Sequence, residues 1–191
     1  MSRKFSSVTL AFLGLWAFSL PAYAQTPATK PQVYTTAPKT VISRFKIGET
    51  EDTVRGMATL MVTTANENDT ITGTLVLNLK DDQRQKLAQA SKQPLQAIPI
   101  TFIRKEVTAV FQSGTACPTL RLELASLEMP FTLTVSAGIS GGQFSFGRLV
   151  LEIQETPAEM TQLFCNWSRQ INVKRQRRGI IAAINRLLAG E

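Results

Sequence analysis

Residues 58–79 read ATLMVTTANENDTITGTLVLNL, two β-branched runs separated by a short polar stretch. The second run, Thr70–Leu79, alternates with period two, which is the pattern of a strand with one buried face. That face carries Ile71, Gly73, Leu75, Leu77 and Leu79. The first run, Ala58–Thr64, is typical of a strand as well, and Ala65–Asp69 supplies polar turn residues. We therefore predict a long antiparallel hairpin.

Other segments with strand character lie on both sides of this hairpin. They are Val41–Ile47, Ala97–Ile103, Val107–Phe111, Leu120–Leu127, Phe131–Ala137 and Phe144–Ile153. In the last segment Gly147 interrupts the alternation, which predicts a β-bulge within one strand. Together with the hairpin they predict an antiparallel sheet of about eight strands.

Helical patterns occur at three places. Asp81–Lys92 is made of helix formers that begin with two acids and end before Pro94. Thr156 and Pro157 are suited to start a second helix, whose apolar face carries Met160, Leu163, Phe164 and Trp167. A last helix runs to about Ala189, with an apolar stripe of Ile180, Ile181, Ile184, Leu187 and Leu188. The predicted fold class is α+β: a β-dominated antiparallel sheet with one mid-chain helix and two C-terminal helices.

Residues 1–24 have the three parts of a secretory signal peptide. Arg3 and Lys4 are the basic region, Val8–Leu20 is the apolar region, and Ala22-Tyr23-Ala24 is the cleavage site. The apolar region is shorter than the roughly 20 residues that a membrane span needs. We expect a periplasmic or secreted protein cut after Ala24, with no transmembrane helix in the mature chain.

The rest of the chain divides into two parts. Residues 25–39 are rich in Thr, Pro and Ala, with prolines at 27, 31 and 38, and predict an extended leader. Residues 40–191 have the length of a single domain with its own core.

The two cysteines, Cys117 and Cys165, agree with export, because the compartments that a signal peptide reaches are oxidising. We predict a disulfide between them that ties the sheet to a C-terminal helix. The chain-entropy model gives such a bridge about 4 kcal/mol of stabilisation as an upper figure.

The chain of 191 residues contains no histidine. This excludes Ser-His-Asp and Cys-His catalysis and His-ligated metal sites within this chain. Two cysteines are too few for a four-thiolate metal site. We expect no cofactor and no metal.

One catalytic motif nevertheless occurs, because Gly138–Gly142 matches the G-x-S-x-G nucleophile elbow of hydrolases, with Ser140 at its centre. The residues that follow it have strand character, whereas the elbow requires a helix. A glycine-rich hairpin turn explains the same five residues. Acidic clusters at 49–52 and 152–159 indicate solvated surface, and Asn66–Asp69 indicates the hairpin turn in preference to a calcium site.

Charge is concentrated at one end of the chain. Residues 25–168 contain 13 basic and 13 acidic groups, whereas residues 169–191 contain six basic groups and one acidic group. The densest run is Lys174, Arg175, Arg177 and Arg178. Such a run is suited to phosphate-bearing partners, and the apolar stripe after it is typical of interfacial helices. A C-terminal helix packed on the sheet, with its charged side in water, explains the same pattern.

These observations favour a non-enzymatic, exported envelope protein that binds an anionic amphiphile, either a lipid or a lipopolysaccharide-like molecule. Lys174, Arg175, Arg177 and Arg178 are the predicted binding residues, and peripheral membrane contact is compatible with this reading. The alternatives are a protein-interaction or structural subunit of a periplasmic or outer-membrane assembly, and a histidine-free hydrolase. Nucleic acid is the weakest partner, because no aromatic residues interleave with the basic run.

Overall fold

A computed structural model of the chain describes residues 33–111, 117, 120–135, 138–153, 158–169 and 174–190. The predicted signal peptide and most of the predicted leader lie outside these residues. So do Thr156 and Pro157, the predicted start of the second helix.

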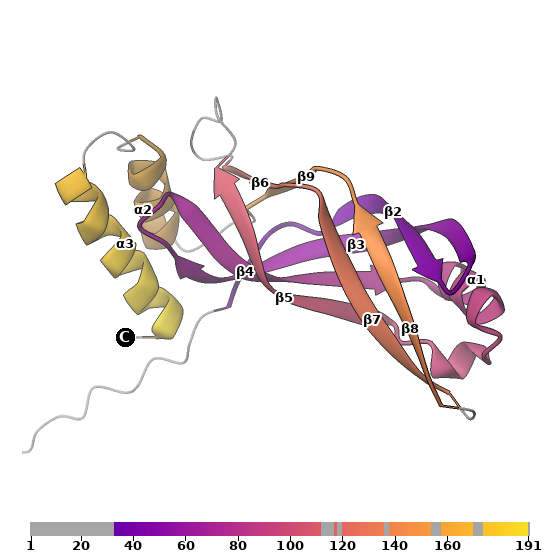
Figure 1. The fold of residues 1–191 in the computed structure, drawn as a ribbon. Helices are drawn as coiled ribbons and strands as arrows, with labels where there is room; N and C mark the ends of the chain where they lie inside the picture. The colour runs from indigo at the N-terminus through magenta and orange to yellow at the C-terminus, as the bar shows by residue number, and fades with distance from the viewer. Residues whose placement is uncertain are drawn as a thin grey trace, which may run out of the picture.

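Within the described residues, nine strands form one antiparallel sheet (Figure 1). Their order is β7-β8-β2-β3-β4-β5-β6-β9, and β1 pairs with β3. The strands are β1 (Tyr34–Thr35), β2 (Lys39–Ile47), β3 (Thr50–Ala65), β4 (Thr70–Leu79), β5 (Thr101–Phe111), β6 (Arg121–Leu124), β7 (Leu127–Val135), β8 (Gly138–Phe146) and β9 (Leu149–Glu152). The helices are α1 (Asp81–Ser91), the short 3-10 helix η1 (Leu95–Ala97), α2 (Ala158–Arg169) and α3 (Lys174–Ala189). The predicted fold class is confirmed.

The β3–β4 hairpin is confirmed, with pairing from Gly56 and Leu79 to Ala65 and Ile71. β3 begins at Thr50, well before the predicted strand, because its first residues pair with β2. The inward side chains of both strands are buried and the outward ones alternate with them, as period two requires.

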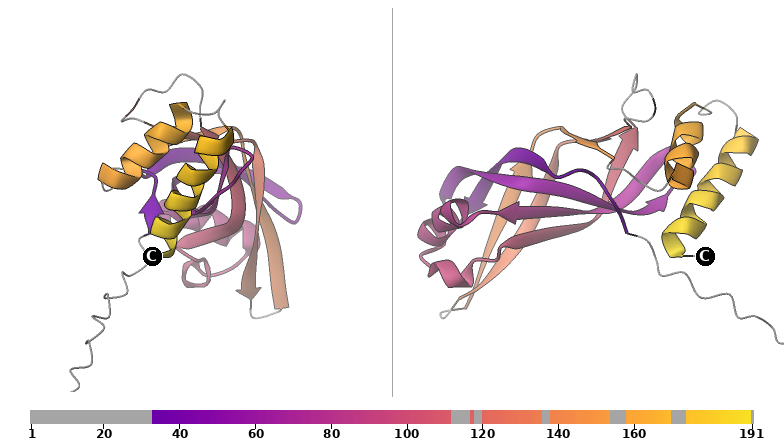
Figure 2. Two further views of the ribbon diagram at one scale, coloured as in Figure 1. Left: turned by 90° about the vertical axis from the view of Figure 1, so that its left-hand side faces the viewer. Right: turned by 180° about the vertical axis from the view of Figure 1, so that it is seen from behind.

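The prediction of one bulged strand over Phe144–Ile153 is wrong. β8 ends at Phe146 and pairs with β2 and β7, whereas β9 begins at Leu149 and pairs with β6. β2 and β6 lie far apart in the strand order, so the chain leaves one part of the sheet and joins the other between β8 and β9. This crossing, together with the β6–β7 crossing, curls the sheet around its core (Figures 1 and 2).

Three further strand predictions need correction. Ala97–Ile103 and Val107–Phe111 are not separate strands, because β5 is continuous from Thr101 and absorbs its irregularity in a bulge at Glu106, whose φ is 56°. Ala97 itself belongs to η1. The predicted strand Leu120–Leu127 contains the whole of β6 and the first residue of β7, because the chain changes its pairing partner there.

The domain begins before residue 40, which differs from the predicted leader boundary at Lys39. Tyr34 is 5% exposed and pairs with Val62 of β3. Thr36 exchanges backbone and side-chain hydrogen bonds with Leu60 and also pairs with Ile153 after β9. This segment therefore joins β3 to the strand at the far end of the sheet order.

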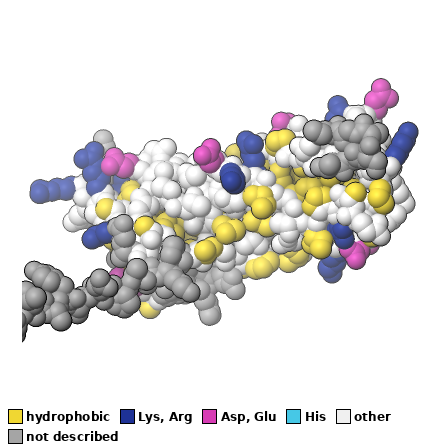
Figure 3. Space-filling model, turned by 90° about the horizontal axis from the view of Figure 1, so that it is seen from below, with side chains coloured by type: hydrophobic (Ala, Val, Ile, Leu, Met, Phe, Trp, Pro, Cys, Tyr) yellow, Lys and Arg dark blue, Asp and Glu magenta, His cyan; other side chains and the backbone are white. Residues whose placement is uncertain are grey.

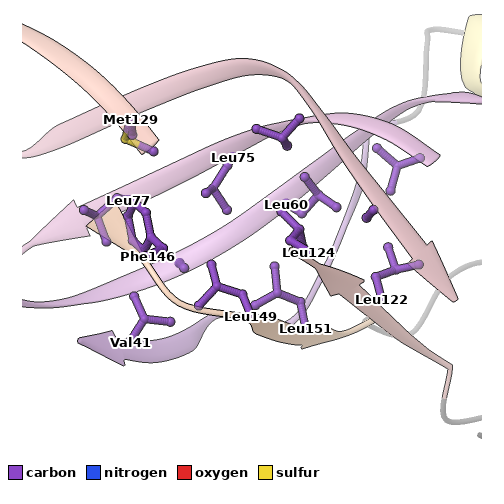
Figure 4. Close-up of a cluster of buried hydrophobic side chains, with 14 of the residues drawn as sticks. Val41, Leu60, Leu75, Leu77, Leu122, Leu124, Met129, Phe146, Leu149 and Leu151 are labelled. Atoms are coloured by element: carbon purple, nitrogen blue, oxygen red, sulfur yellow. The ribbon is translucent and has the colours of Figure 1, made fainter. Parts of the chain in front are cut away.

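The interior of the curled sheet is filled by aliphatic and aromatic side chains (Figure 4). Leucines from β3, β4, β6 and β9 meet there with Met129 and Phe146. Next to Phe146 and Leu77, the rings of Phe102, Phe131 and Phe144 pack edge-on or tilted. The enclosed space is thus a packed core.

Candidate functional site

α2 and α3 lie side by side across one end of the sheet (Figure 2). The apolar stripe of α3 faces the core, because Ile181 and Ile184 are buried. Asn185 fixes the register of α3: its Nδ2 donates to the carbonyl of Ala65 at 2.9 Å, and its Oδ1 accepts from the backbone N–H of Ala65 at 2.8 Å. α3 is therefore anchored to the last residue of β3.

α2 is anchored by a disulfide. Cys117 and Cys165 are bonded, with their Cα atoms 5.8 Å apart, as predicted. On the same helix Met160, Phe164 and Trp167 are fully buried. The bridge therefore ties a helix that packs on the core to the segment between β5 and β6.

The β3–β4 turn connects to both helices through Asp69. Its Oδ1 accepts a hydrogen bond from the indole Nε1 of Trp167 at 3.2 Å, and its Oδ2 lies 2.5 Å from Nη1 of Arg177. Asp69 has a φ of 64°, a left-handed conformation that Asp tolerates in turns. These contacts place Asp69 and Trp167 in the site, and the sequence pattern assigns neither of them such a role.

The structure separates the four predicted binding residues. The Arg177 side chain is 14% exposed and forms the ion pair with Asp69, so it braces the turn. Arg175 is exposed, and Arg178 is 72% exposed with Nε 3.6 Å from the carboxylate of Glu67. Lys174 begins α3, and its side chain lies outside the described part.

Arg169 joins this group from the end of α2, where it is exposed. We call Arg169, Lys174, Arg175 and Arg178 the α2–α3 basic corner. Figure 3 shows Lys and Arg side chains gathered at this end of the molecule, on the left as in Figure 1. The charge count along the sequence already includes Arg169 with the run in α3, and the structure places it at the end of α2, the helix that packs beside α3.

The positions of these charges are unfavourable for α3 itself. Cations at a helix N-terminus oppose the helix dipole, which places partial positive charge there. Arg175 and Arg178 are three residues apart, so their like charges are neighbours on the helix surface. The exposed pair of Arg178 with Glu67 offsets less than about 1 kcal/mol of this cost.

The apolar stripe of α3 is occupied by packing. Ile180, Leu187 and Leu188 are partly buried against the core, beside the fully packed Ile181 and Ile184. This arrangement corresponds to a C-terminal helix that packs on the sheet. An interfacial helix that inserts its stripe into a membrane would have to leave the core.

The G-x-S-x-G motif lies within β8, whose strand Gly138–Phe146 pairs with β7 along its length. Neither the strand-turn-helix context of an elbow nor the predicted hairpin turn occurs at these residues. Gly142 has a packing role instead, since a Cβ there would overlap the ring of Phe131. The Ser140 side chain lies outside the described part.

Several of the acidic candidates have structural partners, whereas Glu155 lies outside the described residues. Glu152 pairs with Arg121 at 2.8 Å, and Glu51 lies 3.8 Å from Arg44. Asn66 donates to the hydroxyls of Thr70 and Thr72, as a hairpin turn residue does. The described residues contain no group of three acidic, Cys or His side chains arranged to hold a metal.

In the described part of the chain no helix has both the length and the apolar character to cross a bilayer. Comparisons with protein-family models, curated proteins and solved structures find no match to this chain.

Proposed function

We propose that this protein is an exported, non-enzymatic binding domain of the cell envelope. Its α2–α3 basic corner contacts an anionic amphiphile surface, namely the phosphate groups of lipids or of lipopolysaccharide. The disulfide supports export, because such bonds persist in oxidising compartments.

The observation that carries the proposal is the set of exposed cations at the start of α3. Arg175 and Arg178 stand at a position that costs helix stability, and the core-facing contacts of α3 are made by other residues. Arg177 shows the contrast, because its guanidinium braces Asp69. A charge that opposes local stability and is not needed for packing is explained by a partner outside the domain.

The contact is electrostatic and peripheral, because the apolar stripe of α3 stays in the core. Each Arg or Lys near an anionic membrane surface contributes about 1 kcal/mol, and the attraction falls off within a Debye length. Guanidinium groups are suited to phosphate because their fork of N–H donors matches its oxygens. Binding is therefore expected to be reversible and sensitive to salt.

A vesicle co-sedimentation experiment tests this. The full mature chain should bind vesicles that contain anionic phospholipid more strongly than neutral ones, and added salt should weaken the binding. Arg175→Gln with Arg178→Gln should weaken it roughly tenfold or more, from the loss of about 2 kcal/mol. A matched control is Lys46→Gln with Lys105→Gln, which removes the same charge from exposed strand positions.

Equal binding to neutral and anionic vesicles would refute the proposal, and so would equal losses in the two double variants. Both variants alter exposed side chains, so circular dichroism should show the same fold for each. Vesicles that contain lipopolysaccharide distinguish the two sources of phosphate.

A second candidate, a protein-interaction subunit, is favoured by the outer face of β3 and β4. From Met57 to Thr63 and from Thr70 to Asn78 the outward positions carry no charge. The centres of protein interfaces are likewise depleted of charge. If Val76→Lys abolishes a stoichiometric complex recovered from envelope extracts while vesicle binding is absent, this candidate replaces the first.

A further inference from the structure

A second concentration of cations lies at the opposite end of the molecule from α2 and α3, where α1 packs near the ends of β2, β3 and β4 (Figure 1). A groove of about 380 Å³ is found there. We call it the α1 groove. Its lining includes Ile42, Arg55, Met57, Lys80, Asp82 and Lys86.

Three of these residues are cations. Arg55 and Lys80 are exposed, and in the described part of the chain neither has an acidic group within ion-pair distance. Lys86 is held in place, since its Nζ donates to the carbonyl of Thr53 at 3.0 Å and lies 3.9 Å from the carboxylate of Asp52. The groove thus has one cation held in an ion pair and two exposed cations, Arg55 and Lys80, of which Lys80 also interacts at longer range with the charge of Asp82.

Asp82 is the one carboxylate in the lining. Gln83 donates from Nε2 to Asp82 at 2.8 Å, and its Oε1 accepts from the backbone N–H of Arg55 at 2.9 Å. The hydrogen bond from Gln83 lowers the pKa of Asp82 below its ordinary value, and the charge of Lys80 adds to the shift. With Asp52, which pairs with Lys86, two negative charges stand against three positive ones, so the groove keeps a net charge of +1.

The wall of the groove is also apolar. Ile42 on β2 is 64% exposed and lies in the same lining as the three cations. Met57 on β3 is half-buried, and the hydroxyl of Thr40 lies 3.3 Å from its sulfur. Cations and exposed aliphatic groups around one hollow are suited to a ligand that has both characters.

We propose that the α1 groove binds a small amphiphile with one anionic head, a phosphate or a carboxylate, and a short alkyl chain. Arg55 and Lys80 contact the head, and Ile42 and Met57 contact the chain. The volume is near the lower end of the range for small-molecule sites, about 300–1,000 Å³. This site goes beyond the proposed function, because it binds a single molecule at the end remote from the basic corner.

Titration of the mature chain with hexyl phosphate, followed by amide chemical shifts in NMR, tests the site. Shifts should concentrate at the start of α1 and on β2 and β3 around the groove. Hexanoate should act at the same place if a carboxylate is accepted, whereas inorganic phosphate and hexanol should each bind more weakly. Ile42→Ser should lower the affinity for hexyl phosphate and leave the affinity for inorganic phosphate unchanged.

For each charge variant the proposal predicts whether the affinity for hexyl phosphate rises, falls or stays the same. Arg55→Gln with Lys80→Gln should lower the affinity for hexyl phosphate roughly tenfold or more. Asp82→Asn should raise this affinity, because it removes a negative charge from the groove. Arg175→Gln with Arg178→Gln should leave it unchanged, which separates this site from the α2–α3 basic corner. Absence of saturable shifts at the groove, equal affinity for hexanol, or no effect of the Arg55 and Lys80 changes would overturn the proposal.

Discussion

At the scale of single residues, the two glycines at the end of the G-x-S-x-G motif have different surroundings. A Cβ on Gly142 would lie 2.6 Å from Cε2 of Phe131 and 3.0 Å from Cγ1 of Ile47, whereas a Cβ on Gly141 would meet nothing within 4 Å. An aromatic ring over a strand glycine is a recurrent packing solution in sheets. The Gly142 position therefore serves the packing of Phe131.

We predict that Gly142→Ala lowers the free energy of unfolding by about 1–3 kcal/mol through overpacking. Gly141→Ala is the matched control and should leave stability unchanged or raise it by up to about 1 kcal/mol, since it restricts the unfolded chain. Urea unfolding of both variants measures the difference. Equal stabilities would show that Phe131 moves aside without cost.

Tyr34 of β1 is buried and lies within electrostatic range of Glu159 on α2. Burial, and secondarily the negative charge of Glu159, raise the pKa of Tyr34 above its ordinary value of 10.0. Its neutral form is thus favoured in the folded state, and the unfolded chain loses the phenolic proton first. This contribution to stability is present below the unfolded pKa and is lost as pH rises through the folded pKa.

We therefore predict that stability falls as pH rises above about 10. A chain that begins at Gln25 has Tyr34 as its single tyrosine, so ultraviolet absorbance follows tyrosinate formation directly. Titration should show a pKa above the ordinary value, returning toward it in denaturant. In Tyr34→Phe the alkaline loss of stability should shrink, and an unchanged loss would assign it to other groups.

At the scale of elements, the disulfide and the buried face of α2 stabilise the same helix by different means. The bridge joins residues 48 apart in the sequence and so restricts the unfolded chain. Met160, Phe164 and Trp167 are buried independently of it. Loss of the bridge should therefore weaken the fold without removing α2 from the core.

We predict that Cys117→Ser with Cys165→Ser lowers the free energy of unfolding by about 2–4 kcal/mol. Reductant should destabilise the native chain to a similar extent and leave the double variant unchanged. In the chain from Gln25, Trp167 is the single tryptophan, so its fluorescence reports whether α2 stays packed. A solvent-exposed tryptophan spectrum in the folded double variant would show that packing depends on the bridge.

The sequence pattern predicts most helices and strands. It misses the strand boundaries that depend on which other strand is the pairing partner. Period two reveals β2 and β4 and the second half of β3, because each has one buried and one exposed face. It divides β5 in two, because the bulge at Glu106 interrupts the alternation there. It does not reveal that Phe146 and Leu149 belong to strands with different partners, since alternation is the same on both sides of the crossing. In the site it identifies Cys117 and Cys165, yet the role of Asn185 depends on its contact with Ala65.

At the scale of the whole molecule, the curled sheet depends on the segment before β2. Thr36 is fully buried and contacts both Leu60 of β3 and Ile153 after β9. The backbone N–H of the next residue, Ala37, donates to the backbone carbonyl of Glu152 at 2.8 Å. Residues that look like a leader in sequence thus join two distant parts of the sheet.

We predict that a chain beginning at Lys39 is less stable than one beginning at Val33 by about 3 kcal/mol or more. The loss combines the burial of Tyr34 with the hydrogen bonds of Thr36. Denaturant unfolding gives the difference, and hydrogen exchange should show faster exchange of the Leu60 and Ile153 amides in the shorter chain. Similar stability and exchange in the two chains would mean that the curled sheet holds without this segment.

The sequence by itself determined the class of fold, the disulfide and the location of the excess charge. These properties follow from local periodicity and composition, which can be read from each segment without knowing its neighbours in space. Only the tertiary structure decided that Arg177 is bound to Asp69 while Arg175 and Arg178 face solvent, and that the α3 stripe lies in the core. It also decided that Arg55, Lys80 and Lys86 meet at one groove. The physical reason is that burial and ion pairing depend on neighbours far away in the chain, and an isolated run of residues does not specify them.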